Sequence, residues 1–156
     1  MSTARTLDQR RSDALAVLEA QGSAWLATAG VGPGTAASPH VIAVSVAWDG
    51  ATLLLATKDG SPTARNLDAS GHGSLVFGTP QDVVMVDATV IHSLPADAEA
   101  GPTATAFTTA MGWDPAEEGP DWRYFTLRPA RIQAYRGYGE LGGHVLMQDG
   151  LWRTAS

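Results

Sequence analysis

The chain has 156 residues, of which 44% are hydrophobic and 17% charged, and it carries a formal net charge of −6 without a single cysteine. This composition and length are typical of one globular domain with one core, and the missing cysteines exclude disulfides, thiolate metal sites and a cysteine nucleophile. The acidic balance argues against nucleic-acid binding, which needs cations to neutralise phosphates.

The sequence gives no sign of a membrane span or of an export signal. No apolar run reaches the roughly 18–20 residues that a membrane-spanning helix needs. Residues 1–11 are polar and lack the apolar segment of a signal peptide. We therefore expect a cytoplasmic protein that does not bind membranes.

The first predicted element is a helix within residues 1–22. Thr6 and Gln9 stand at capping-box spacing, so each side chain can bond the backbone amide of the other residue. Apolar residues then recur at helical spacing from Leu7 to Leu18. Gly22 is a natural stop for this helix.

Three strands are predicted next, at residues 24–29, 40–48 and 52–57. A loop rich in glycine and proline, beginning with residues 30–34, follows the first of them. Asp49-Gly50 is a tight-turn signal between two apolar runs. The second and third strands should therefore form a hairpin.

A short helix and two more strands come after this hairpin. Serine suits the N-cap and proline the first turn, so Ser61-Pro62 predicts a helix start, and the helix should end before Gly71. Strands are predicted at residues 74–77 and 82–93, with a turn between them.

The last part of the chain contains one more strand. Residues 96–110 look helical but are broken by Gly101-Pro102, and residues 113–121 form an acidic loop. The final strand spans residues 124–136 and should be bent, or lie at a sheet edge, near Pro129.

This order of elements predicts a mainly β (α+β) fold. Several strands follow one another through short connections, whereas a doubly wound parallel sheet needs a helix between most strands. A mainly antiparallel barrel with short helices at its ends fits better. We assign the barrel to residues 23–136 and a glycine-rich tail to residues 137–156, within a single domain.

The segment from Thr57 to Leu67 is the most informative for chemistry, because a strand ends there, a glycine turn follows and a helix begins. The first turn of a helix offers free N–H groups and a positive dipole end, which bind phosphate readily. Neighbouring side chains can add hydroxyl donors and positive charge: Thr57, Ser61 and Thr63 supply hydroxyls, and Lys58 and Arg65 supply charge. The alternative is that Ser61-Pro62 only starts a helix and that Arg65 is a solvated charge.

Other catalytic and metal-binding patterns are weak. The chain's four histidines are scattered and no pair has the spacing of a metal-binding helix. Ser45 lies in an apolar strand, outside any nucleophile motif, and we expect its hydroxyl to bond the backbone. Asp87 lies within an apolar run, where it is either a solvent or rim residue or a paired functional carboxylate.

Four of the five tryptophans have two possible roles each. Trp25 and Trp48 lie on predicted strands and should belong to the core or to a subunit interface. Trp113 and Trp122 flank the acidic loop, where they either pack together or form the wall of a planar ligand's site.

The order and spacing of these pieces resemble the split β-barrel flavin-binding family related to pyridoxamine 5′-phosphate oxidase, especially its small actinobacterial members. The resemblance covers about residues 20–136. The matching pieces are Trp25–Thr28, Pro39–Val44, Leu54–Thr57, Ser61–Leu67, Gly73–Val76, Asp82–Ala88 and Arg128–Tyr135.

The resemblance implies a homodimer of six-stranded split barrels. FMN, or alternatively the deazaflavin coenzyme F420, would lie in a groove at the dimer interface and exchange a hydride with a small planar or unsaturated substrate. Carried over to this chain, the cofactor contacts fall into three sets: Thr57, Ser61 and Thr63 at the phosphate, Ser45 and Val46 along the isoalloxazine ring, and Arg65 and Asn66 at the phosphate or ribityl group.

The chain departs from the family pattern at one place. The oxidase proper carries an Arg-Lys pair just after its serine, whereas Pro62-Thr63 stands here. Lys58 and Arg65 can replace the lost charge only in part, so oxidation of pyridoxamine phosphate itself is not expected. Two alternatives to an oxidoreductase stay open: a non-catalytic protein that binds flavin or haem, and a dimeric barrel without a cofactor.

Overall fold

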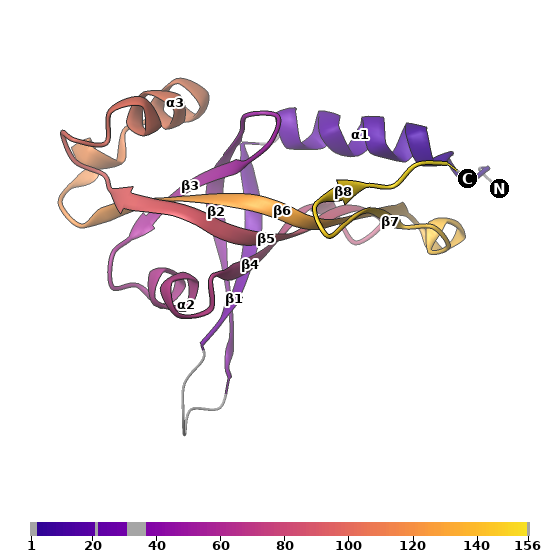
Figure 1. Ribbon diagram of the computed structural model, residues 1–156, viewed down its shortest axis with the longest axis horizontal. Coiled ribbons are helices and arrows are strands. Elements are labelled where there is room, and N and C mark those ends of the chain that lie inside the picture. The colour runs from indigo at the N-terminus through magenta and orange to yellow at the C-terminus, as the bar shows by residue number, and fades with distance from the viewer. Residues whose placement is uncertain (1–2, 21, 31–36, 156) are drawn as a thin grey trace.

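An antiparallel sheet of eight strands dominates the computed structural model, which describes residues 3–20, 22–30 and 37–155 (Figure 1). The strand order is β3-β2-β1-β4-β5-β6-β7-β8, and a further pairing of β3 with β6 closes the first six strands into a barrel. The strands are β1 (Ser23–Ala29), β2 (Pro39–Trp48), β3 (Leu53–Lys58), β4 (His72–Thr79), β5 (Asp82–Pro95), β6 (Trp122–Arg136), β7 (Val145–Gln148) and β8 (Leu151–Trp152).

The barrel core follows from the alternation of side chains along these strands. Leu26, Leu55, Leu75, Phe125 and Ile132 come from four strands, β1, β3, β4 and β6, and all are fully buried inside the barrel. Residues between them point outward, as expected for a period of two. The predicted mainly β antiparallel barrel is therefore confirmed, with two extra strands from the glycine-rich tail.

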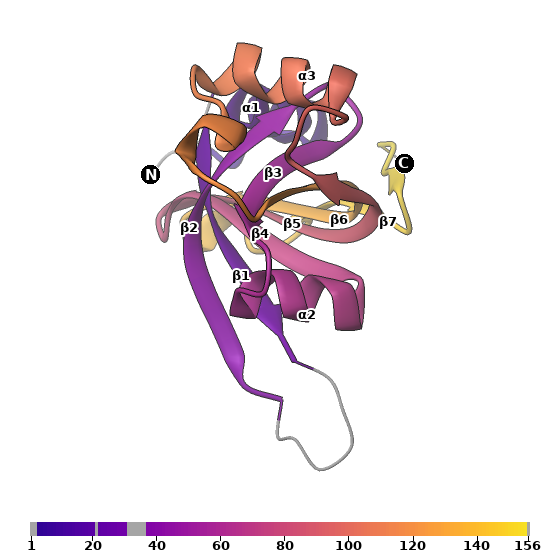
Figure 2. The ribbon, with the colours of Figure 1, turned by 90° about the vertical axis from the view of Figure 1, so that its left-hand side faces the viewer.

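In the part of the chain that the structure describes, three α-helices surround the barrel: α1 (Leu7–Ala20), α2 (Pro62–Ser70) and α3 (Gly101–Met111). Figures 1 and 2 show α1 and α3 on one side of the barrel and α2 on the opposite side. The predicted capping box of α1 is confirmed, because the Thr6 N–H donates to Gln9 Oε1 over 2.9 Å and the Gln9 N–H donates to Thr6 Oγ1 over 3.2 Å.

Two details of the sequence prediction change. Gly101-Pro102 does not break a helix but begins α3, because proline's missing N–H costs nothing in the first helical turn. The predicted glycine-proline loop begins at Gly30, but its residues 31–34 lie outside the described residues.

Strand β6 carries a bulge next to Pro129. Asp87 of β5 pairs with Arg131 while Ala88 pairs with Pro129, which leaves Ala130 without a partner on β5. On the other edge of β6, pairing with β3 ends at Leu127 and pairing with β7 begins only at Ile132. Pro129 therefore lies where no neighbouring strand needs its N–H.

A second, smaller core covers the outer face of β3 and β6. Phe107 of α3 lies 5.2 Å from Trp113 and 5.5 Å from Tyr124 between ring centroids, and Trp113 lies 5.4 Å from Trp122. A short 3-10 turn, η1 (Pro115–Glu118), follows Trp113. Of the two predicted roles for Trp113 and Trp122, the structure shows packing against each other.

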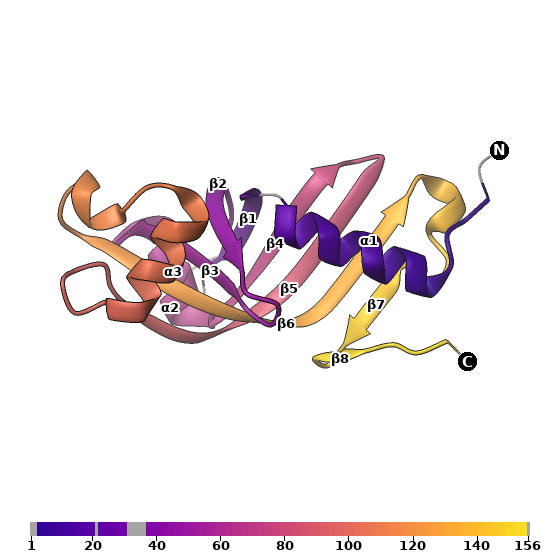
Figure 3. The same ribbon diagram turned by 90° about the horizontal axis from the view of Figure 1, so that it is seen from above.

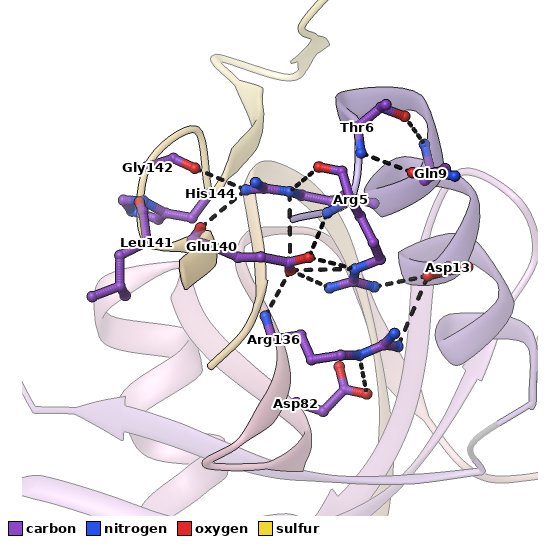
Figure 4. A network of polar contacts seen from close by, with 11 residues as sticks. Arg5, Thr6, Gln9, Asp13, Asp82, Arg136, Glu140, Leu141, Gly142 and His144 are labelled. Atoms are coloured by element: carbon purple, nitrogen blue, oxygen red, sulfur yellow. Dashed lines mark hydrogen bonds and ion pairs between the residues drawn. The ribbon is translucent and has the colours of Figure 1, made fainter. Parts of the chain in front are cut away.

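An ion-pair network joins the N-terminal segment to the tail (Figure 4). The buried Glu140 carboxylate, in the 3-10 turn η2 (Tyr138–Glu140), accepts hydrogen bonds from Arg5 N (2.9 Å), Nε (3.0 Å) and Nη2 (2.6 Å) and from Arg136 N (2.8 Å). Arg10 Nη1 donates to the Glu140 and Gly142 carbonyls over 3.0 and 2.9 Å. Figure 3 shows α1 beside the tail at this end of the molecule.

Candidate functional site

The corner between β3 and α2 holds the predicted phosphate site. Ser61 is the N-cap of α2, and its Oγ accepts the Ala64 N–H over 3.1 Å. Thr57 Oγ1, at the end of β3, lies 3.4 Å from Ser61 Oγ. The helix start is thus confirmed, and the Ser61 hydroxyl still has a hydrogen to donate, because capping uses only a lone pair.

Two further predicted residues of α2 lie close to this corner. Thr63 is buried one residue after Pro62, and Asn66 Nδ2 donates to Thr28 Oγ1 over 3.1 Å. The Asn66 bond ties α2 to β1. Sequence reasoning did not single out Thr28, because nothing local marks it as a partner of a helix that begins more than thirty residues later.

The two predicted cations point to backbone carbonyls. Lys58 Nζ donates to the Pro120 carbonyl over 3.2 Å and lies 5.1 Å from the centroid of the Trp122 ring. The Arg65 guanidinium donates to the Gly60 carbonyl. Both side chains are exposed beside the corner, and neither forms an ion pair with another described residue that an incoming anion would have to break.

A third cation, Arg123, was missed by the sequence analysis. It pairs with Thr57 across β3 and β6, and it binds Asp68 (2.7 Å) and Asp59 (3.3 Å). The Asp68 hydrogen bonds raise the pKa of Arg123 above its ordinary value. Three cations and two carboxylates therefore surround the corner. Only the register of two strands far apart in sequence brings Arg123 here, so no local signal could have revealed it.

Ser45 and Val46 lie apart from the hydroxyl cluster, on β2. Val46 pairs with Leu55, two residues before Thr57. The Val46 side chain is only 1% exposed and belongs to the barrel core, so any ligand contact would come from its backbone. Ser45 points to the opposite, outer face of β2.

That outer face is unusually apolar where β2, β1 and β4 adjoin. Trp25 of β1 is 56% exposed and Val41 of β2 is 57% exposed. Ala43 and Val76 are the strand partners of Trp25 on either side. Trp25 is therefore not a core residue, whereas Trp48 packs against the core. Large exposed apolar patches of this kind mark interaction surfaces.

Metal binding finds no support in the described part of the chain. There, no group of three or more histidine or acidic side chains could hold a metal ion. Within the same residues, no helix is both long and apolar enough to cross a bilayer.

Comparison with known proteins gives the family. The sequence matches the model described as pyridoxamine 5′-phosphate oxidase over residues 12–136. The chain therefore belongs to the pyridoxamine 5′-phosphate oxidase family. A comparison with curated proteins gives no match.

Several solved structures share the fold. One is an F420 reductase, 22% identical with a TM-score of 0.59, covering 75% of this chain and 93% of that chain. Another is an FMN-binding protein related to pyridoxamine 5′-phosphate oxidase from Nostoc punctiforme, 15% identical with a TM-score of 0.56 and 83% of each chain covered. A FAD-binding protein from Mesorhizobium loti is 16% identical, with a TM-score of 0.60 and coverage of 78% and 89%.

Proposed function

We propose that this chain binds a flavin-type cofactor, FMN or the deazaflavin coenzyme F420, and exchanges a hydride with a small planar or unsaturated substrate. The observation that carries the proposal is the pair of hydroxyls, Thr57 Oγ1 and Ser61 Oγ, 3.4 Å apart at the start of α2. Fold neighbours described as an F420 reductase, an FMN-binding and a FAD-binding protein support a cofactor of this class.

The donors at the corner fit a phosphate group. Pro62 has no backbone N–H. The backbone N–H of Ala64 donates to Ser61 Oγ, and the backbone N–H of Arg65 donates to the Ser61 carbonyl. The Thr63 N–H is thus the one amide of this first turn left for a ligand, beside the hydroxyls and the helix dipole. Thr57, Ser61 and Thr63 would hold the phosphate, and a bound cofactor would supply the redox chemistry.

Charge at the corner has to come from side chains that turn toward the ligand. Arg65 can exchange the Gly60 carbonyl for a phosphate oxygen, which is the stronger acceptor. Lys58 can do the same with the Pro120 carbonyl. Because the family's Arg-Lys pair is replaced by Pro62-Thr63, we infer weaker phosphate binding than in the oxidase proper, and a substrate other than pyridoxamine phosphate.

The cofactor ring would lie at the interface of a homodimer. The apolar outer face around Trp25 and Val41 supports a second copy as the partner, because such a surface is costly to leave in water. Ser45 points outward from β2, as Val41 and Ala43 do. A ring held along Ser45 would therefore be shielded from water by the partner subunit.

Titration of the apoprotein with FMN and with coenzyme F420, followed by cofactor fluorescence, tests the proposal. The triple variant Thr57→Val, Ser61→Ala, Thr63→Val should bind at least about ten-fold more weakly, because hydrogen bonds to a charged group contribute about 1.5–3 kcal/mol each. Thr109→Ala, on the exposed face of α3, is the matched control. Unchanged affinity in a triple variant that is folded by circular dichroism would refute the phosphate site.

Turnover separates the remaining alternatives. With a reduced cofactor, an enzyme should reduce a nitro or quinone acceptor, whereas a non-catalytic flavin binder should bind the cofactor without turnover. A protein that binds neither cofactor in titration would be the barrel that lacks a cofactor site, and a preparation that takes up haem instead would support the haem-binding alternative.

A further inference from the structure

A pocket of about 520 Å³ opens at the C-terminal end of α2, away from the phosphate corner. Its walls come from the end of β1, the first residue of β2, the start of β4 and the middle of β5. This volume lies within the range of roughly 300–1,000 Å³ that is usual for small-molecule sites. None of the residues assigned to the cofactor lines it, but Ala27 pairs with Val41 and with Ser74, so the pocket borders the outer face that we assign to the dimer.

Short side chains create this pocket. Its lining includes Ala27, Ala29, Gly73, Ala88 and Ala130. Ala130 is the bulged residue of β6, and bulges are common beside functional sites. The hollow is thus built where the sheet is locally irregular and where side chains too small to fill the space gather from four strands.

One hydrogen-bonded pair supplies the carboxylate of the pocket. Ser74 and Asp87 face each other across β4 and β5, and Ser74 Oγ donates to Asp87 Oδ1 over 2.6 Å. A serine has one hydroxyl hydrogen, so Asp87 Oδ2 remains an acceptor with no hydrogen bond from the described residues. The rest of the lining combines small apolar residues, namely four alanines, Gly73 and Pro39, with the hydroxyl-bearing Thr28, Ser70 and Thr89 and with His72.

Among the described lining residues there is no lysine or arginine to neutralise this carboxylate. The nearest candidate by strand register is Arg131, the partner of Asp87 on β6. Within the described residues Arg131 forms no ion pair with Asp87, and its buried Nε has no hydrogen-bond partner. Asp87 is therefore a half-buried carboxylate whose one partner in the described structure is a neutral hydroxyl.

We propose that this pocket binds a small planar ligand that presents N–H donors, such as an amine, an amidine or the N–H edge of a heterocycle. The N–H groups would donate to Asp87, because an ionised carboxylate only accepts hydrogen bonds. The apolar body of the ligand would contact the alanines and Pro39. An anionic ligand would meet the Asp87 carboxylate with no lysine or arginine in the described lining to offset it, so it could rely only on His72 and on neutral donors. The proposal does not depend on the cofactor assignment.

Benzamidine and benzoate are matched probes, since they share an aromatic ring and differ in charge and in N–H donors. Titration of the ¹⁵N-labelled protein by NMR should show saturable shifts of pocket amides, such as those of Ala27, Ser74 and Asp87, with benzamidine and not with benzoate. Absence of these shifts, or equal shifts with benzoate, would overturn the proposal.

Two variants locate the binding. Asp87→Asn keeps the shape of the side chain and should weaken benzamidine binding at least about ten-fold, whereas Asp82→Asn, an exposed site on the same strand, should leave it unchanged. Ala130→Leu fills the pocket without touching the carboxylate and should block binding even if Asp87→Asn does not fold. Undiminished binding in a folded Asp87→Asn or Ala130→Leu protein would refute the site.

Discussion

Ser61 has two functions that its chemistry makes compatible. Its oxygen accepts the Ala64 N–H and so caps α2, while its hydrogen is free for Thr57 or for a phosphate. Helix capping and anion binding therefore leave the same mark in the sequence, a serine before a helix. Sequence reasoning could identify Thr57, Ser61 and Thr63 as a cluster, but it could not tell which of the two functions the cluster serves.

The orientation of long side chains was beyond sequence reasoning at this site. Lys58 and Arg65 turn to carbonyls that belong to Pro120 and Gly60. On β2, the Val46 side chain points into the core, and its neighbour Ser45 points outward. A family resemblance assigns positions along the chain, whereas the direction of a side chain depends on strand register and on which acceptors lie nearby.

Two glycines give a matched prediction at the scale of single residues. Gly78 and Gly50 have φ angles of +88° and +96°, but a Cβ on Gly78 would lie 2.2 Å from the Asp82 carbonyl oxygen, whereas a Cβ on Gly50 would meet nothing within 4 Å. Gly50→Ala should cost only conformational strain, about 1–2 kcal/mol. Gly78→Ala should cost at least about 2 kcal/mol more, as backbone must move. Urea unfolding of both variants measures the difference, and equal losses would contradict the expectation.

At the scale of elements, the extent of the strands was more predictable than their partners. The apolar pattern of residues 124–136 predicted most of β6, which spans Trp122–Arg136. The pattern did not reveal that β6 pairs with β5 along one edge and shares its other edge between β3 and β7. Apolar alternation marks a buried face, but the choice of neighbour depends on contacts distant in sequence.

The junction of α1 with the tail predicts how stability depends on pH. The Arg5 hydrogen bond is the main cause that lowers the pKa of Glu140 from 4.5 to about 2. A carboxylate with a depressed pKa in the folded state stabilises the protein fully above pH 4.5 and loses this contribution as the pH falls toward 2. Glu140→Gln should lower the free energy of unfolding by about 3 kcal/mol at pH 7.

The difference between the wild type and Glu140→Gln should shrink between pH 4.5 and pH 2. Glu117→Gln, at an exposed position of η1, should change neither the stability nor its pH dependence appreciably. Denaturant unfolding at several pH values provides the measurement. A gap that persists at pH 2, or that is absent at pH 7, would show that the Arg5–Glu140 contact does not stabilise the fold.

At the scale of the whole molecule, the outer face around Trp25 predicts the oligomeric state. We expect a dimer in solution, and Trp25→Glu should convert it to a monomer and weaken cofactor binding at least about ten-fold, because a charge buried at an interface without a partner is costly. Light scattering after size-exclusion chromatography gives the mass. Leu151→Glu is a control, since Leu151 is 74% exposed on β8, outside this face. A monomeric wild type, or a dimeric Trp25→Glu protein, would argue against this interface.

The barrel itself was predictable because local and global signals agree. Hairpin turns, alternating apolar residues and the capped helix α2 each favour the same antiparallel arrangement. The pocket beside Asp87 was not predictable, because its lining residues come from five strands and the end of α2, and most of them have only small size in common. An alanine in a strand has the same appearance in sequence whether it is packed against a neighbour or borders an empty volume.

Closure of the barrel through β3 and β6 has a consequence for synthesis of the chain. β3 ends at Lys58, and its closing partner begins only at Trp122. Because the ribosome releases the polypeptide from its N-terminus, β3 emerges before its partner β6. The backbone groups on one edge of β3 stay unpaired until residues 59–121 and then β6 have been translated. This waiting period is when a nascent chain exposes an open strand edge to other molecules, and when a chaperone would protect it most.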